Sequence, residues 1–112
     1  MGIIICNKHG KKGIKINIDK KIIDNIHSGV NIKEEDLVIV TVELFDELDF
    51  LLEYKILFRK DTFVENKLKY FYKISNELEE EEELLPVEGL LSGVCGECYF
   101  EYMKNNNINI NF

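Results

Sequence analysis

Two short pairs of metal-binding residue types, one near each end of the chain, constrain the fold more than any other feature. Cys6 and His9 have the spacing C-x2-H, and Cys95 and Cys98 have the spacing C-x2-C. A glycine adjoins each pair, which favours a tight turn that directs two donor atoms to one point. Together the four side chains make the Cys3His set that structural zinc sites use. Because the pairs lie about 85 residues apart, a shared Zn2+ would join the two ends of one domain.

All three cysteines of the chain and one of its two histidines belong to these pairs. We therefore predict a structural Zn2+ held by Cys6, His9, Cys95 and Cys98. Two other interpretations stay open. Cys6 can be a small buried apolar residue at the end of a strand, with His9 as a turn residue. The segment 95–98 can also form a redox-active dithiol, since a helix N-terminus lowers the pKa of a thiol.

The residues after Cys98 predict a short helix up to Lys104, whose ammonium group suits a helix C-terminus. Thiolates in the first turn of such a helix are stabilised by exposed backbone N–H groups. A turn with two ligands near the start, a hairpin and a ligand-bearing helix at the end resemble the ligand layout of treble-clef and zinc-ribbon sites. The segment between the two halves is much longer here than those families usually have.

Length and composition indicate one soluble domain that spans residues 1–112. Of these residues 46% are hydrophobic, which is enough for a small core. No apolar run approaches the length of a membrane-spanning helix. Three cysteines cannot all form disulfides within one chain, and metal ligation suits a reducing compartment. We therefore expect a cytoplasmic protein.

The net charge of −7 is unevenly distributed along the chain. Residues 1–33 carry a balance of +5 and residues 54–76 a balance of +4, whereas residues 34–53 and 77–112 carry −8 each. Blocks of this kind create local fields of opposite sign. The two acidic blocks repel a polyanion, so a general nucleic-acid-binding role is not expected.

The first third of the chain predicts two strands and a helix. Residues 2–6 are largely apolar, and residues 13–18 alternate between apolar and polar side chains, which is typical of strands. Asp19 is a good N-cap for a helix over residues 20–28, and Gly29 suits its C-terminal end.

The middle of the chain predicts a sheet. Residues 37–44 are rich in Val, Ile and Leu and indicate a central strand, with residues 50–58 as its antiparallel partner across an acidic turn at 46–49. Residues 67–74 carry apolar side chains on both faces and favour a further strand. The expected fold is therefore an α+β domain with a mainly antiparallel sheet and two or three helices. The Cys3His site would join its termini.

The last part of the chain predicts a helix over residues 75–85 that ends before Pro86, because the residue before a proline disfavours the helical conformation. A loop over residues 87–93 would then deliver the second ligand pair. The asparagine-rich end, residues 105–111, is expected to be frayed or to form a short edge strand.

Nothing in the sequence points to an active site. His27 is the one histidine outside the pairs, and its place at a helix end suits contact with carbonyl groups better than metal ligation. No nucleophile and base remain, because the predicted metal set takes all the cysteines. A catalytic zinc would need an open coordination position and a carboxylate such as Glu97, whereas a Cys3His zinc is usually closed. We therefore expect a protein that is not an enzyme.

The two ends of the chain also resemble a known class of proteins. The opening segment Ile-Ile-Ile-Cys-Asn-Lys-His-Gly at 3–10 and the closing segment Val-Cys-Gly-Glu-Cys at 94–98 are similar to small bacterial zinc-knuckle proteins of the immunity type. Such proteins are encoded beside polymorphic or contact-dependent toxins. The resemblance implies a cytoplasmic protein that binds one toxin domain and blocks its active site.

Two function classes follow from these observations. In the first, the protein neutralises a partner with a basic surface, because complementary charge speeds association. The predicted contact residues are Asp46, Glu47, Asp49, Glu79, Glu80, Glu81, Glu82 and Glu83. Runs of acidic residues also serve simply as solvated surface. In the second class, a zinc-ribbon-like adaptor contacts nucleic acid or the transcription machinery through phosphate contacts. Its predicted contact residues are Lys8, Lys11, Lys12 and Lys15.

Overall fold

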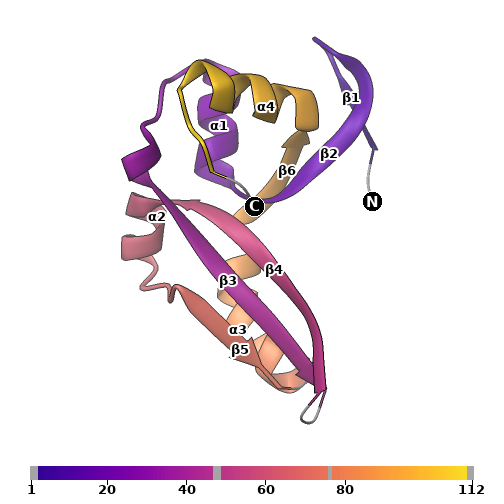
Figure 1. Cartoon of the computed structure of the whole chain (residues 1–112), viewed down its shortest axis with the longest axis vertical. Helices are drawn as coiled ribbons and strands as arrows, with labels where there is room; N and C mark the ends of the chain where they lie inside the picture. The colour runs from indigo at the N-terminus through magenta and orange to yellow at the C-terminus, as the bar shows by residue number, and fades with distance from the viewer. Residues whose placement is uncertain (1–2, 47–48, 76, 111–112) are drawn as a thin grey trace.

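The computed structural model describes residues 3–46, 49–75 and 77–110. These residues form an α+β arrangement of strands and helices (Figure 1). In chain order the elements are β1 (Ile3–Cys6), β2 (Gly10–Asp19), α1 (Lys20–Ser28), the 3-10 helix η1 (Glu34–Asp36), β3 (Leu37–Asp46), β4 (Asp49–Arg59), α2 (Lys60–Glu65), β5 (Phe71–Ile74), α3 (Glu77–Glu88), β6 (Leu91–Cys95) and α4 (Gly96–Asn105). The predicted α+β class is confirmed. The number of α-helices in the described residues is four, instead of two or three.

The strands form one sheet in the order β1-β2-β4-β3-β5, with β6 paired to β2 off this path. Antiparallel pairing joins β1 to β2, β2 to β6 and β3 to β4. The pairings of β2 with β4 and of β3 with β5 are parallel, and the first of these consists of the single register pair Ile18 and Leu57. The sheet is therefore mainly antiparallel, as predicted.

The molecule has two ends along its longest dimension of 44 Å. Figure 1 shows β1, β2, β6, α1 and α4 gathered at one end, and the long β3–β4 hairpin extending to the other. At the hairpin end β5 lies beside β3, and α3 lies behind the sheet. The Cys/His pairs lie on the elements of the first end, and Asp46 and Asp49, the last residue of β3 and the first of β4, lie at the second.

Consecutive residues of β4 belong to two separate hydrophobic cores. Leu57 packs with side chains of β2, α1 and α4, whereas Ile56 and Phe58 pack with side chains of β3, β5 and α3. All three are at most 1% exposed. Successive side chains of a strand point to opposite faces. The middle of the sheet is therefore covered on both faces, and β4 joins the two ends of the molecule.

Asp19 links the start of α1 to the end of β4. Its carboxylate accepts hydrogen bonds from the backbone N–H of Lys21 at 3.0 Å and from that of Arg59 at 2.9 Å, and the residue is 1% exposed. The predicted N-cap and the predicted helix at Lys20–Ser28, with Gly29 in the left-handed conformation after it, are confirmed. The bond to Arg59 is a tertiary contact that the local pattern does not reveal.

A bulge in β2 adapts this strand to β6. The register shifts in the middle of β2, so Ile16 and Asn17 both face Gly93. Asn17 has φ of +62°, a conformation that asparagine adopts more readily than most residues. A Cβ atom on residue 93 would lie 2.6 Å from Cδ1 of Ile14. Gly93 therefore leaves room for the side chain of Ile14, which precedes the bulge.

The predicted loop over residues 87–93 is wrong, because Val87 belongs to α3 and Leu91–Cys95 forms β6. Serine and glycine within this short segment lower its intrinsic strand propensity. Antiparallel pairing with β2 supplies hydrogen-bond partners that the local sequence does not reveal.

The prediction that the helix ends before Pro86 is also wrong, since α3 continues to Glu88. Proline lacks an N–H group, so the helix loses one backbone hydrogen bond. Leu84 and Val87, which flank the proline, are almost completely buried against the sheet. Their burial outweighs the local preference for a helix end.

Three other segments differ from expectation. The strand predicted over residues 67–74 is limited to Phe71–Ile74, because Lys67 has φ of +52° and closes the end of α2. The helix α2 itself was not predicted. The described residues after α4 form no strand and are not frayed, since Ile108 is buried and its N–H donates to the carbonyl of Met103.

Candidate metal centre

The first ligand pair lies in the turn between β1 and β2. Cys6 is the last residue of β1 and pairs with Gly10, the first residue of β2, so residues 7–9 form the turn. Gly10 has φ of +75°, which favours glycine. This tight turn directs the side chains of Cys6 and His9 to the same side.

The second pair lies where β6 ends and α4 begins. Cys95 is the last residue of β6 and the N-cap residue of α4, and Cys98 lies in the first turn of that helix. The predicted helix therefore starts earlier than Cys98, at Gly96. Cys95 pairs with Ile14 of β2, which follows the turn that carries His9. The antiparallel pairing of β2 with β6 is thus what brings the two ligand pairs together.

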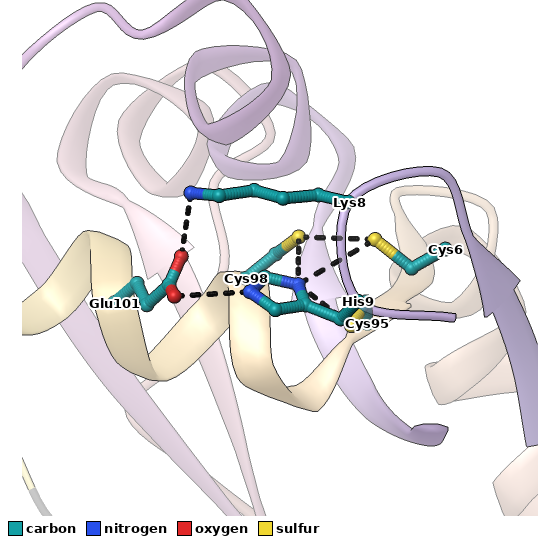
Figure 2. A network of polar contacts seen from close by, with 6 residues as sticks. All are labelled: Cys6, Lys8, His9, Cys95, Cys98 and Glu101. Atoms are coloured by element: carbon teal, nitrogen blue, oxygen red, sulfur yellow. Dashed lines mark hydrogen bonds and ion pairs between the residues drawn. The ribbon is translucent and has the colours of Figure 1, made fainter. Parts of the chain in front are cut away.

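The four donor atoms meet in one cluster (Figure 2). Nδ1 of His9 lies 3.6 Å from Sγ of Cys6, 3.8 Å from Sγ of Cys95 and 3.4 Å from Sγ of Cys98. The sulfurs of Cys6 and Cys98 are 3.5 Å apart, and all four donor atoms lie within 4.8 Å of one another. None of the three cysteines forms a disulfide. The four predicted ligands therefore form a group that can hold a metal ion.

Glu101 forms a hydrogen bond with the ring nitrogen of His9 that faces away from the sulfurs. Its Oε1 accepts a hydrogen bond from Nε2 of His9 at 2.9 Å, and its Oε2 accepts one from Nζ of Lys8 at 2.8 Å (Figure 2). An ionised carboxylate can only accept, so the Nε2 atom carries the proton and Nδ1 faces the sulfurs. The sequence analysis missed Glu101. Its position three residues after Cys98, on the same face of a helix, is the signal that could have identified it.

The pKa values of Cys6, His9 and Cys98 depart from their ordinary values for three different reasons. Backbone N–H groups of His9 and Lys8 lower the pKa of Cys6 to about 6, with a smaller contribution from the His9 side chain. Burial raises the pKa of Cys98 to about 12, and its hydrogen bond with Cys6 adds to this effect. The hydrogen bond with Glu101 raises the pKa of His9 to about 9. The group thus combines a stabilised thiolate at Cys6 with a thiol at Cys98 whose ionisation is favoured only when a cation is nearby.

His27 and Glu97 do not belong to this cluster. Glu97 is exposed, although it lies between two ligands in the sequence. His27 lies in the last turn of α1 and lines a cavity of about 510 Å³ that also reaches Cys6 and Cys98.

Three of the acidic residues predicted to bind a partner have described side chains, and none of these three belongs to the donor cluster. Asp46 and Asp49 face each other at the tip of the β3–β4 hairpin and are exposed, and Glu82 is exposed on α3. Glu47 lies outside the described residues, as do the side chains of Glu79, Glu80, Glu81 and Glu83.

No protein-family model, curated protein or solved structure matches this chain. Within the part of the chain that the structure describes, no helix has the length and hydropathy of a membrane-spanning helix.

Proposed function

We propose that Cys6, His9, Cys95 and Cys98 bind one structural Zn2+. In a tetrahedral site, Zn–S distances of about 2.3 Å and a Zn–N distance of about 2.0–2.1 Å separate sulfur from nitrogen by about 3.6 Å and two sulfurs by about 3.8 Å. The corresponding separations here are 3.4–3.8 Å for the three sulfur–nitrogen pairs and 3.5 Å for Cys6 and Cys98. This agreement, from residues at opposite ends of the chain, is the observation that carries the proposal.

Three features support a structural role for the metal over a catalytic one. Three thiolates and one imidazole fill all four positions of tetrahedral zinc. Glu101 faces His9 and Lys8, so it orients a ligand instead of activating a water molecule. The ligands come from a hairpin turn and a helix N-terminus, which fits a treble-clef-like layout.

Elemental analysis of protein purified without added metal tests the zinc proposal. We expect one equivalent of zinc per chain, and a Cys95→Ser variant should lose most of it because Cys95 is the buried ligand. Less than about half an equivalent of zinc, with three freely titrating thiols, would refute the proposal. A Ser92→Ala variant, changed on the same strand but at an exposed position, is the control and should keep its zinc.

We further propose that the protein is not an enzyme and neutralises a partner protein, as an immunity protein in the cytoplasm blocks a bacterial toxin domain. The exposed acidic tip at Asp46 and Asp49 supports this role, since it projects at the end of the molecule away from the ligand pairs (Figure 1). A negative tip on a chain of net charge −7 favours capture of a basic partner.

The alternative role as a nucleic-acid adaptor has less support. Lys8 pairs with Glu101, and Nζ of Lys15 lies over the Tyr99 ring at 5.4 Å from its centroid. A phosphate bound to either lysine would disturb these contacts. Lys11 and Lys12 are exposed and are therefore the better candidates for phosphate binding.

Kinetic measurements with the product of the neighbouring gene would separate the two roles. For an inhibitor, the Asp46→Lys/Asp49→Lys variant should associate more slowly and with less dependence on salt. The Lys11→Glu/Lys12→Glu variant should keep its association rate. Micromolar binding of DNA or RNA at near-physiological salt, abolished by replacing the lysines, would overturn the choice.

A further inference from the structure

Two of the three cysteine sulfurs in the metal centre lie close enough to react with each other. Sγ of Cys6 and Sγ of Cys98 are 3.5 Å apart, and no disulfide joins them (Figure 2). A disulfide bond has a length of about 2.03–2.05 Å, so the two sulfurs would have to approach by about 1.5 Å. Cys6 ends β1, directly before the turn formed by residues 7–9. Turns move by such an amount more readily than packed elements do.

A small oxidant reaches this pair more readily than it reaches the third cysteine. Cys6 and Cys98 are partly exposed, whereas Cys95 is only 3% exposed. The cavity of about 510 Å³ is lined by all three cysteines. A water molecule takes up about 30 Å³ in the liquid, so the cavity has ample room for hydrogen peroxide, which is only slightly larger. Because oxidation of cysteine follows thiolate character and exposure, Cys6 and Cys98 are the expected targets.

Metal binding would supply the reactive form of both sulfurs. A cysteine that ligates zinc is deprotonated, and the thiolate is the nucleophile in reactions of cysteine. Formation of a disulfide removes the negative charge from both sulfurs and with it their affinity for the metal. Only His9 and Cys95 would then remain, two of the four ligands of a tetrahedral site. Oxidation of the pair is therefore expected to release the metal.

We propose that Cys6 and Cys98 are a redox-active pair that hydrogen peroxide converts to a disulfide, with release of the Zn2+. The Cys6 thiolate attacks one oxygen of the peroxide, the O–O bond breaks and hydroxide leaves, so Cys6 becomes a sulfenic acid. The Cys98 thiolate then attacks the Cys6 sulfur and displaces the second oxygen as hydroxide. The two sulfurs together lose two electrons, and the peroxide is reduced to two hydroxide ions.

The disulfide would take over the structural role of the metal. Cys6 belongs to the β1–β2 hairpin and Cys98 to α4, so the bond connects the same two elements that the Zn2+ would connect. The two cysteines are 92 positions apart in the chain, and a disulfide that closes so long a loop strongly restricts the unfolded chain. A disulfide between Cys95 and Cys98 would not hold β1. This inference rests on the proposed zinc site and adds a redox response that keeps the ends of the fold joined.

Treatment of the zinc-loaded full chain with hydrogen peroxide tests the proposal. We expect release of the bound Zn2+, followed with a chromogenic chelator, and loss of two of the three thiols. Trypsin should then yield fragment 1–8 linked to fragment 74–104, because no lysine or arginine lies between Lys73 and Lys104. Cleavage after Glu97 separates Cys95 from Cys98, and the alkylated free cysteine should be Cys95.

Hydrogen exchange tests whether the disulfide replaces the metal. In the oxidised wild type, which holds no zinc, the amides of β1 should exchange at least about tenfold more slowly than in reduced protein treated with a chelator. The matched control is Cys6→Ser after the same oxidation, and it should show no such protection. A Cys95→Ser variant keeps both members of the pair and should still yield the linked fragments. Mapping of the wild type depends on no variant, so a variant that does not fold leaves the test intact.

Several results would overturn the proposal. They are a disulfide between Cys95 and Cys98, sulfinic or sulfonic acid at Cys6 in place of a disulfide, zinc that stays bound after oxidation, and equally fast exchange of β1 in the oxidised and the chelated protein. The zinc proposal fails separately from this one. Reduced protein that holds one equivalent of zinc but forms no Cys6–Cys98 disulfide would refute the redox pair alone. Reduced protein that holds no zinc yet forms this disulfide would refute the metal site and support the pair.

Discussion

Replacing Asp19 with alanine should destabilise the whole fold, although the residue is not one of the four metal-donor residues. The substitution removes two hydrogen bonds at once, one to the N–H of Lys21 in the first turn of α1 and one to the N–H of Arg59 at the end of β4. These bonds hold the helix of the metal-binding end against the central strand of the sheet. Because Asp19 is 1% exposed, water has little access to replace them.

The expected loss can be worked out from the two bonds. Removal of an N-cap side chain costs about 0.5–2 kcal/mol. A buried N–H left without a partner costs about 1–3 kcal/mol, and the Arg59 amide is partly buried, which favours the lower half of that range. The variant should therefore lose about 1.5–4 kcal/mol, a large part of the roughly 5–15 kcal/mol that stabilises a typical domain.

Urea denaturation of the zinc-loaded protein measures this loss as a change in midpoint at constant slope. The matched control is Asp24→Ala, which removes the same charge from an exposed position of the same helix and should change stability by less than about 0.5 kcal/mol. An Asp19→Asn variant keeps one acceptor and should fall between the two. A loss below about 1 kcal/mol for Asp19→Ala would show that the two bonds do not hold the ends together.

Three further predictions concern the metal site and the cores. Glu101→Ala should weaken zinc binding about tenfold in a competition assay with a chelator, because Glu101 orients His9, whereas Glu97→Ala should leave the affinity unchanged. An equal effect of both variants would contradict that role. Removal of zinc by a chelator should abolish hydrogen-exchange protection in β1, whose Ile3 and Ile5 are exposed, and preserve it at Val40 and Val42 in the separate core. Uniform loss of protection would argue against two independent cores. Ile56→Ala should cost about 2–5 kcal/mol because the side chain is 1% exposed, and Ile5→Ala should cost less than about 0.5 kcal/mol. Similar costs for the two would be inconsistent with the described packing.

Local patterns in the sequence are enough to predict several elements. The helix at Lys20–Ser28 follows from an N-cap aspartate, a suitable apolar pattern and a glycine after its end, all within a few residues of each other. The β3–β4 hairpin follows from two apolar runs joined by a short acidic turn. The four metal ligands follow from residue type and spacing. For the helix and the hairpin the stabilising partners are close in the chain. The two ligand pairs are far apart, but the spacing within each pair is local, so each pattern is visible without the fold.

Other features depend on partners far away in the chain. The strand β6 exists because β2 pairs with it, and α3 continues past Pro86 because Leu84 and Val87 are buried against the sheet. Glu101 becomes important only when the pairing of β2 with β6 places His9 beside it. The free energy of these contacts comes from burial and pairing between distant segments, and only the tertiary structure decides which segments meet.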